Sequence, residues 1–409
     1  MTTVAIISEY NPFHTGHEYQ VEKIRQRFGQ NTGIIAVMSG NYTQRGEIAI
    51  LDKYTRAECA VRAGINLVLE LPFPFSMSSA EFFARAGVKI ANSLGVVDYL
   101  SFGAETADAE ALTAVAKNMI KAEFTEKLSI LTNDPKYKAL GYPRLVSLAY
   151  SECFSESLGR DFFKPNSILA LEYIKALILE KSRIIPHAVL RLGADYNEKK
   201  IVNSQYQSAS AIRNLMTNDL SSALDYIPNV TKNTLLRAYE NNEFPTDCER
   251  IASALISSFR LNSSEDVTDI HDARGGLYNR LYENSFKVGK INDLITLTET
   301  KKYTRARIRR ALWYSFFGVT SSKVKELPEY TQILAMDEVG QKILKEARKM
   351  TDFPILTKPS RLDLLSEKSR RQKELSDKAD SVFQLTKPRF FDGSLSLKAT
   401  PYVKKTSTN

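Results

Sequence analysis

The chain has 409 residues, of which 43% are hydrophobic and 25% charged, with 18 Gly and 14 Pro. This composition excludes disordered, collagen-like and low-complexity classes for the chain as a whole and predicts a globular protein of about two or three domains. The net charge of +9 is concentrated at one end: residues 301–409 carry 24 Lys and Arg against 12 Asp and Glu, whereas residues 1–150 carry 15 of each. A basic region joined to a neutral one is typical of polyanion binding, most often of nucleic acid, with a solvated basic surface as the alternative.

Cysteine usage and the apolar pattern restrict the cellular setting. Cys59, Cys153 and Cys248 are far apart and form no CxxC pair, which argues against a disulfide framework and against a thiolate metal site. The first residues lack the basic stretch and apolar run of a signal peptide, and no window approaches about 18 consecutive apolar residues. We therefore expect a cytoplasmic protein with no membrane segment.

The N-terminal half alternates strands and helices. An apolar, β-branched run at residues 3–9 predicts a strand, and the spacing of Tyr19, Val21, Ile24 and Phe28 predicts the helix that follows it. Further strands are predicted at 32–40, 66–72 and 97–103, separated by helices at 53–64 and 78–95. Fully apolar strands alternating with helices predict a parallel α/β sheet covered on both faces, with ligands at the carboxyl ends of the strands.

The remainder of the chain has a mainly helical pattern. Residues 105–180 contain helical patterns, one more strand is expected at 184–193, and a loop enters a helix at 207–216. Beyond residue 216 we expect little strand apart from a short one in the C-terminal tail. The sequence thus predicts a Rossmann-like parallel-sheet domain over residues 1–216, followed by a mainly α-helical, basic domain over residues 217–409.

Two of the four histidines lie directly after the first predicted strand, in the segment NPFHTGH. His14 and His17 flank Gly16, whose missing side chain allows close approach to the backbone, and the segment enters a helix whose N-terminal amides attract anions. This arrangement favours a phosphate site. A zinc site is the alternative, but HxxH without a further Cys or an HExxH frame supplies too few ligands.

Two motifs resemble the HIGH-type nucleotidyltransferase superfamily. His14-Thr15-Gly16-His17 is similar to its HxGH signature, whose histidines stabilise charge on the phosphates of ATP during attack on the α-phosphate. Residues 207–213, QSASAIR, resemble its serine-rich xSxxxIR element, in which hydroxyls and an arginine bind the β- and γ-phosphates. The candidates here are Ser208, Ser210 and Arg213.

Longer blocks resemble one family, the tRNA(Met) cytidine acetate ligases. They include SEYNPFHTGH, MSGNYTQRGEIAILDKYTRAECA, LVLELPF, SSAEFFARAG, FGAE, KPNSILALEY, LRLGADYN and KKYTRARIRRAL, between residues 8 and about 312. The resemblance implies that ATP and acetate form acetyl-adenylate with release of pyrophosphate, an activation that Mg²⁺ is expected to accompany. The acetyl group then passes to N4 of the wobble cytidine of elongator tRNA(Met), giving N4-acetylcytidine.

The same resemblance implies a set of ATP contacts. They are Ile7, Ser8, Glu9, Tyr10, Asn11, Pro12, Phe13, His14, Thr15, Gly16, His17, Glu18, Tyr19, Gln20, Gly103, Asn166 and Arg191. The residues alone leave other roles open, because Gly103 is also suited to a turn, Asn166 to a helix cap and Arg191 to the surface. One departure from the family pattern is Asn66, where an acidic residue is expected.

A polar, glycine-flanked loop follows the second predicted strand and is suited to a small anionic substrate. Its candidates for an acetate pocket are Ser39, Gly40, Asn41, Gln44, Arg45 and Lys53, with Arg45 or Lys53 as the cation for the carboxylate. The alternative for Lys53 is a helix start, at which Asp52 is the N-cap and Lys53 and Arg56 lie on a solvated face.

The strongest basic cluster lies at 301–310, beside the only tryptophan of the chain, Trp313. Its cations are candidates for contacts with tRNA phosphates, although Ile308, Leu312 and Phe316 also predict a helix docked on the core with its cations in solvent. The six candidates are Lys301, Lys302, Arg305, Arg307, Arg309 and Arg310.

The sequence therefore favours an ATP-dependent tRNA-modifying ligase over two alternatives. One is a nucleotidyltransferase that adenylylates a small phosphorylated metabolite without RNA, which would not need the C-terminal basic excess. The other is a non-enzymatic RNA-binding protein, which the complete HxGH and SxxxIR motifs disfavour. His187, His271 and the cysteines are expected to be structural, no residue is assigned to a metal, and the oligomeric state is not predicted.

Overall fold

The computed structural model describes residues 1–137, 140–154, 160–191, 206–262 and 269–405. Its centre is one mixed sheet with the strand order β5-β4-β1-β2-β3-β6-β7, in which β8 pairs with β6. All pairs are parallel except β3 with β6. The strands are β1 (Thr3–Ser8), β2 (Gly33–Ser39), β3 (Leu67–Leu71), β4 (Tyr99–Ala104), β5 (Ile185–Leu190), β6 (Thr331–Met336), β7 (Ile355–Leu356) and β8 (Tyr402–Val403).

Helices cover both faces of this sheet because its strands are apolar on both sides. In β1, Ala5 and Ile7 face one core and Val4 and Ile6 the other. The N-terminal helices are α1 (Thr15–Phe28), α2 (Lys53–Arg62), α3 (Ala80–Ser93), α4 (Ala109–Met119), α5 (Ala122–Asn133), α6 (Tyr142–Phe154), α7 (Pro165–Leu179), α8 (Ala209–Asn218), α9 (Leu220–Ala223) and α10 (Asn229–Glu240).

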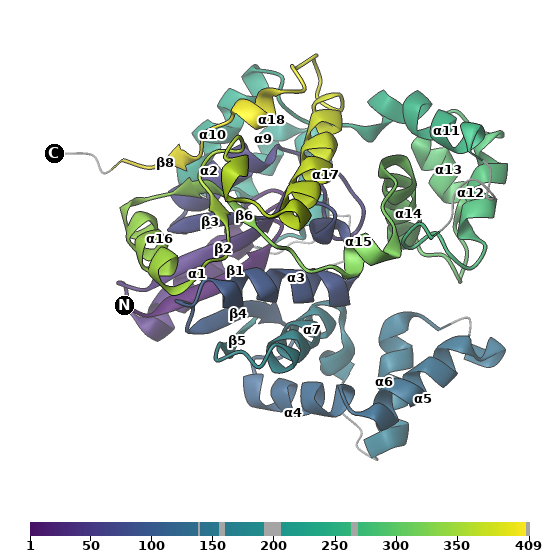
Figure 1. Ribbon diagram of the computed structural model, residues 1–409, viewed down its shortest axis with the longest axis horizontal. Coiled ribbons are helices and arrows are strands. Elements are labelled where there is room, and N and C mark those ends of the chain that lie inside the picture. Colours follow the sequence, from purple (N-terminus) through teal and green to yellow (C-terminus); the bar gives the residue numbers. More distant parts are fainter. Residues whose placement is uncertain (138–139, 155–159, 192–205, 263–268, 406–409) are drawn as a thin grey trace.

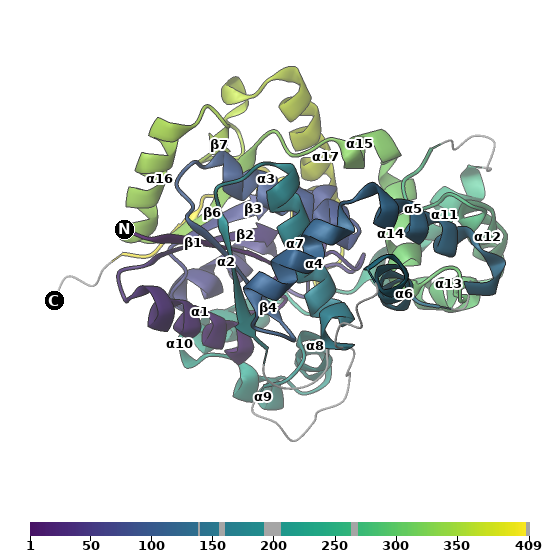
Figure 2. The ribbon, with the colours of Figure 1, turned by 90° about the horizontal axis from the view of Figure 1, so that it is seen from below.

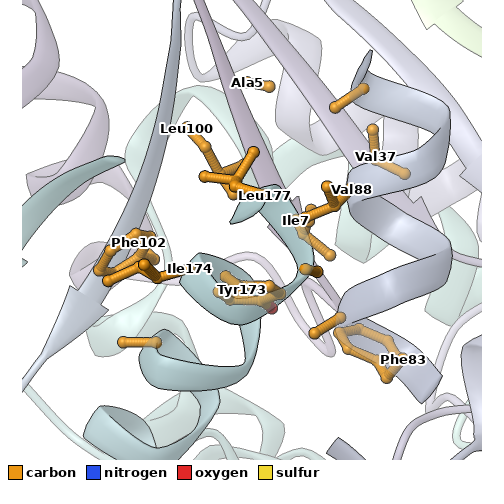
Figure 3. Close-up of a cluster of buried hydrophobic side chains, with 14 of the residues drawn as sticks. Ala5, Ile7, Val37, Phe83, Val88, Leu100, Phe102, Tyr173, Ile174 and Leu177 are labelled. Carbon is orange, nitrogen blue, oxygen red and sulfur yellow. The ribbon is translucent and has the colours of Figure 1, made fainter. Parts of the chain in front are cut away.

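The first core lies between the sheet and α3, α4 and α7, and Figure 3 shows its strand side chains meeting those of α3 and α7. Phe83 of α3 and Tyr173 of α7 lie beside Ile7 at the carboxyl end of β1 in this core. The second core packs α1, α2, α8 and α10 on the opposite face. The polar site described below therefore stands on a floor of fully packed side chains.

A helical lobe projects from one end of the sheet in both views (Figures 1 and 2). It has its own core, which Tyr42, Phe73 and the helix Glu367–Gln384 (α17) join from the sheet side. The remaining α-helices among the described residues are α11 (Ala252–Leu261), α12 (Leu277–Ser285), α13 (Ile291–Thr298), α14 (Arg305–Phe317), α15 (Ser321–Lys325), α16 (Glu338–Met350), α17 (Glu367–Gln384) and α18 (Leu395–Lys398).

The predicted fold class, a parallel α/β sheet followed by a mainly helical region, is confirmed. The expected strands at 3–9, 32–40, 66–72, 97–103 and 184–193 are all present. The structure differs in its last third, because β6, β7 and β8 return to the sheet and α16 packs on it. The sheet thus crosses the boundary expected near residue 216. No helix within the described ranges is both long and apolar enough to cross a bilayer.

Candidate active site

The HxGH segment forms the turn between β1 and α1. His14 is the N-cap of α1, and its Nδ1 accepts a hydrogen bond from the amide of Gly16 at 3.1 Å. The Nδ1 of His17 accepts in return from the amide of His14 at 3.2 Å. The two rings are tilted by 31° to one another, with their centroids 3.8 Å apart. Because both Nδ1 atoms act as acceptors, each neutral ring carries its proton on Nε2.

The surroundings keep both imidazoles uncharged. Burial, together with Arg191 and Arg213, lowers the pKa of His14 to about 3. Burial, with His14 and Arg191, holds the pKa of His17 well below its ordinary value. At neutral pH the pair therefore offers two N–H donors at a helix N-terminus, which is an arrangement suited to phosphate oxygens.

The absence of a side chain at Gly16 leaves room for the ring of His14. A Cβ atom at this position would lie 2.9 Å from Cε1 and 3.1 Å from Nδ1 of His14, which is closer than side chains normally approach. The sequence predicts that something approaches the backbone here. The structure shows that the ring of His14 is itself that neighbour.

These histidines open into a pocket of about 210 Å³ at the carboxyl ends of β1, β4 and β5. This is the edge at which parallel sheets bind ligands, and β1 is the strand where the connections switch direction. Apolar side chains of α3 and α7, including Phe83 and Tyr173, form one wall. The predicted ATP contacts that line the pocket are Ile7, Ser8, Glu9, Tyr10, Asn11, His14, Gly16, His17, Tyr19, Gln20, Gly103, Asn166 and Arg191.

Other predicted ATP contacts lie near the pocket without lining it. Pro12, Phe13, Thr15 and Glu18 belong to the same loop and helix, and Phe13 is buried against His17. Residues 192–197 of the LRLGADYN block lie outside the residues that the structure describes. A Cβ atom at Gly103 would meet no neighbouring group within 4 Å, so this glycine leaves the pocket wall open rather than serving a turn.

Glu105 organises the side of the pocket formed by β4 and α7, and it was not among the residues predicted from the sequence. Its carboxylate accepts hydrogen bonds from the amide and the side chain of Asn166, and from the amide and the hydroxyl of Ser167. Asn166 in turn accepts from Arg191 at 3.1 Å. The FGAE block contains this residue, but its partner lies about 60 residues away in sequence, so no local pattern reveals the contact.

The SxxxIR element packs against the HxGH loop. Ser208 is the N-cap of α8, and its hydroxyl accepts from the amide of Ala211 at 3.1 Å. Arg213 donates to the carbonyl oxygen of Asn11 at 3.0 Å, to Ser210 at 3.2 Å and to the Glu47 carboxylate at 2.8 Å. The two motifs, separated by about 190 residues, thus meet at one edge of the site.

The loop after β2 divides its predicted acetate residues between two environments. Gln44 lines the pocket, and its backbone amide donates a hydrogen bond to the carboxyl group of Glu9. Burial raises the pKa of this carboxyl group. Ser39, Gly40, Asn41, Arg45 and Lys53 do not line it.

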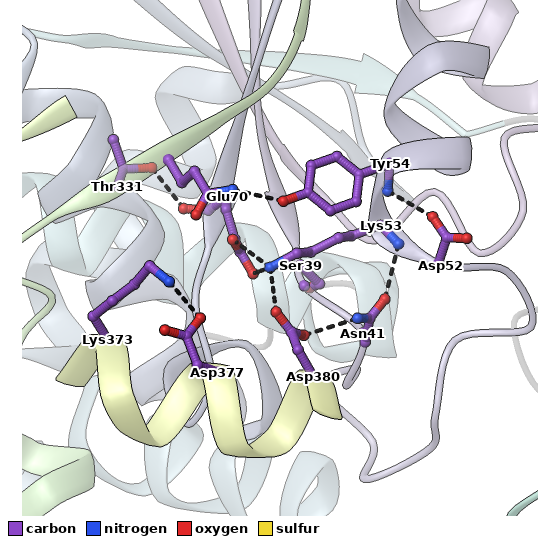
Figure 4. A network of polar contacts seen from close by, with 12 residues as sticks. Ser39, Asn41, Asp52, Lys53, Tyr54, Glu70, Thr331, Lys373, Asp377 and Asp380 are labelled. Carbon is purple, nitrogen blue, oxygen red and sulfur yellow. Dashed lines mark hydrogen bonds and ion pairs between the residues drawn. The ribbon is translucent and has the colours of Figure 1, made fainter. Parts of the chain in front are cut away.

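Lys53 is buried, not solvated, and one of its two ion-pair partners lies near the C-terminus (Figure 4). Its ammonium group lies 2.7 Å from Glu70 and 2.5 Å from Asp380 of α17, and Asn41 also donates to Asp380 at 2.8 Å. Burial alone would lower the pKa of Lys53, but the two carboxylates outweigh it and hold that pKa well above the ordinary value. The charge of Lys53 is therefore fully occupied within the protein.

Arg56 and Asn66 also have structural partners. Arg56 is completely buried and donates to the carbonyl oxygens of Leu51, Glu9 and Ser39, which ties the loops after β1 and β2 together. The expected solvated face of α2 is therefore wrong for Lys53 and Arg56, although Asp52 is the N-cap as predicted. Asn66 lies at the amino end of β3, at the edge of the sheet opposite the pocket. Its side chain accepts a hydrogen bond from the amide of Ile34 and donates one to the carboxylate of Asp337.

The basic cluster spans the loop before α14 and the first turns of α14, and the helix is docked on the lobe core through Ile308 and Leu312. Its cations mostly contact protein groups. Arg309 pairs with Glu47 at 2.5 Å, Arg310 with Asp272 at 2.5 Å and Arg305 with Glu299 at 2.9 Å. Arg307 and Lys302 donate to backbone carbonyl oxygens of the loop before α12, and Lys301 is exposed.

The remaining histidines lie outside both motifs. His187 of β5 contacts Ser101 and Phe28, and His271 packs between Phe82 and Tyr314. Over the described part of the chain, no group of three or more His, Cys, Asp or Glu side chains is close enough to hold a metal ion.

Comparison with known proteins agrees with this geometry. A profile of the family described as HIGH Nucleotidyl Transferase matches residues 1–394. The tRNA(Met) cytidine acetate ligase of Caldanaerobacter subterraneus subsp. tengcongensis is 35% identical over 373 residues, 90% of this chain and 92% of that protein. The chain belongs to the tRNA(Met) cytidine acetate ligase family of HIGH nucleotidyl transferases.

Further relatives of this ligase family cover nearly the whole chain. The Clostridium novyi tRNA(Met) cytidine acetate ligase is 34% identical over 88% of this chain and 90% of its own length. The apo crystal structure of Thermotoga maritima TmcAL matches with a TM-score of 0.92 at 30% identity, over 99% of this chain and 100% of that one. A crystal structure of TmcAL with bound alpha-thio ATP matches with a TM-score of 0.89. The family resemblance predicted from the motifs is confirmed, and the match continues beyond residue 312.

Proposed function

We propose that the protein activates acetate with ATP and transfers the acetyl group to N4 of the wobble cytidine of elongator tRNA(Met). The observation that carries this proposal is the neutral His14–His17 pair at the N-terminus of α1, facing a pocket that Arg191 also lines. Such a site is suited to the triphosphate of ATP. The related ligases and the TmcAL complex with alpha-thio ATP support the choice of substrates.

In the first step an acetate oxygen would attack the α-phosphorus of ATP, and the bond to the β-phosphate oxygen would break, which releases pyrophosphate. The Nε2–H groups of His14 and His17 would donate to the phosphate oxygens as their charge develops. Arg213 lies beside them and would bind the β- and γ-phosphates as a cation. Mg²⁺ would accompany ATP, held mainly by phosphate oxygens and water.

In the second step the cytidine N4 amine would attack the carbonyl carbon of acetyl-adenylate, AMP would leave, and the nitrogen would lose a proton. The pocket supplies an apolar wall for the acetyl methyl group, formed by side chains such as Phe83 and Phe102. Among the cations, Arg191 lines the pocket and is the candidate for the acetate carboxylate, in place of Lys53. The cytoplasm is the expected location of this reaction.

The test is acetate-dependent exchange of pyrophosphate into ATP, together with incorporation of labelled acetate into purified elongator tRNA(Met). H17A is expected to abolish exchange while tRNA affinity stays near the wild-type value. H271Q, which changes a histidine outside the pocket, is the matched control and should retain exchange. Exchange without transfer to this tRNA would refute the acceptor, and exchange that needs a phosphorylated metabolite instead of acetate would favour the RNA-independent nucleotidyltransferase.

A further inference from the structure

A second cavity, of about 570 Å³, lies between the sheet domain and the helical lobe. Its lining comes from the loop after β2, from α8, from residues 246–248 and from the facing sides of α11, α13 and α14. A volume of this size is in the range of pockets that hold small organic ligands. The cavity contains none of the HxGH residues, so it is a separate site and not an extension of the first pocket.

The two cavities share a wall. Gln44 lines the first pocket, and Gly46 and Glu47 of the same loop line the second. The Glu47 carboxylate accepts from Arg213 at 2.8 Å and from Arg309 at 2.5 Å, and Arg213 also bonds the HxGH loop through the carbonyl oxygen of Asn11. A ligand in the second cavity would therefore lie next to the adenylate-forming site.

Close packing fixes the basic helix against this wall. Gly46 has a φ of +76°, and a Cβ atom there would lie 2.6 Å from the amide nitrogen of Arg310 and 2.7 Å from Cβ of Arg309. The loop after β2 and the start of α14 thus touch through their backbones. Whatever occupies the second cavity contacts both the loop that borders the first pocket and the helix that carries the basic cluster.

The lining combines three kinds of group. Leu312, Trp313 and Ile295 form a buried apolar floor. Asn214 and Asn292 are exposed at the rim, where their amide groups can donate and accept hydrogen bonds. Charged groups complete the lining: the partly exposed guanidinium groups of Arg213 and Arg309 share the Glu47 carboxylate, and Asp247 is a second acid. A planar apolar surface, amide groups and a guanidinium match the base, the base edge and the phosphate of a nucleotide.

We propose that this second cavity binds one nucleotide of the tRNA substrate, adjacent to the cytidine that enters the first pocket. Its base would rest on the floor at Leu312 and Trp313, and its phosphate would contact Arg309. The inference rests on the proposed function and specifies how that function holds its RNA. Free acetate is too small to fill the cavity. The cavity lacks the imidazole donors of the first pocket, and Arg213, which would bind the triphosphate of ATP, lies where the two cavities adjoin.

Trp313 is the only tryptophan of the chain, so its fluorescence reports directly on this cavity. We expect an anticodon stem-loop RNA with the target cytidine to change the Trp313 emission of the full-length protein, whereas ATP alone leaves it nearly constant. N214F places a ring at the cavity rim, and N218F places the same ring four residues later on α8, outside the lining. N214F should lower kcat/KM for tRNA about tenfold or more, the range of one stacked base, and N218F should not.

Pyrophosphate exchange measured on the same samples separates the two proposals. Absence of acetate-dependent exchange in the wild-type protein would refute the proposed function, whatever RNA does to Trp313. If exchange and acetyl transfer proceed while RNA leaves the Trp313 emission unchanged and N214F acetylates tRNA as well as N218F does, the second cavity is not an RNA site. A Trp313 response to ATP as large as that to RNA would likewise overturn the assignment.

Discussion

Replacing Lys53 by Met should destabilise the protein strongly, because Lys53 neutralises two buried carboxylates. Lys53, Glu70 and Asp380 are each no more than 3% exposed, and both carboxylates lie within 2.8 Å of the same ammonium nitrogen. Without it, at least one carboxyl must bind a proton at pH 7. Protonating a group of ordinary pKa ~4.3 costs about 4 kcal/mol at that pH, in the range of ~3–5 kcal/mol for breaking a buried ion pair.

The assay is urea unfolding of K53M and wild type at several pH values. Since the variant's folded state holds a proton that its unfolded state lacks near neutral pH, its deficit should shrink by about 1.4 kcal/mol per pH unit as the pH falls towards 5. D380N leaves the Lys53–Glu70 pair intact, so its free energy of unfolding should fall less than that of K53M. The neutral triple variant K53M/E70Q/D380N should recover much of the loss. A deficit of K53M below about 1 kcal/mol, or one independent of pH, would refute this reasoning.

Three further predictions concern the pocket. Because folding lowers the pKa values of His14 and His17, stability should fall as the pH drops below about 6.5, the ordinary pKa of histidine. For His14 the loss should be about 2 kcal/mol at pH 5, and His17 should add to it. Urea titrations of H14N/H17N should lack this slope. G16A should displace the His14 ring and slow pyrophosphate exchange by about ten- to a hundredfold, and normal exchange would contradict the contact. Because the ring is also the N-cap of α1, the unfolding free energy should fall by about 1 kcal/mol. E105Q should raise KM for ATP about tenfold, the effect of losing ~1.4 kcal/mol of hydrogen bonding; an unchanged KM would remove Glu105 from the positioning of this wall.

Much of the sheet could be predicted because its central strands are short, apolar and separated by well-marked helices. β6 escaped prediction since it begins with Thr331 and Gln332, polar residues that are nevertheless buried. Thr331 donates to the carbonyl oxygen of Glu70, and Gln332 donates to Tyr54. These partners lie more than 250 residues away along the chain, so the polarity indicates a loop locally and the segment becomes a strand only in its tertiary setting.

In the candidate site, too, local contacts could be predicted from the sequence and contacts between distant residues could not. His14, Gly16 and His17 act on one another within four residues, so their motif predicts their arrangement. Lys53 was a reasonable acetate ligand from its loop alone, because its partner Asp380 is 327 residues distant. Burial by a remote helix determines whether a lysine is free to bind a substrate, and sequence spacing carries no information on that burial.

The return of the C-terminal strands to the sheet affects how the protein is made. β3 gains its neighbour β6 only after residue 336 has been synthesised, and the ammonium of Lys53 meets its second carboxylate only after residue 380. During translation the nascent nucleotide-binding sheet therefore carries an open edge strand, a surface prone to pairing with other chains. Completion of the sheet and of the Lys53 ion pairs must therefore await the synthesis of residues 331–380.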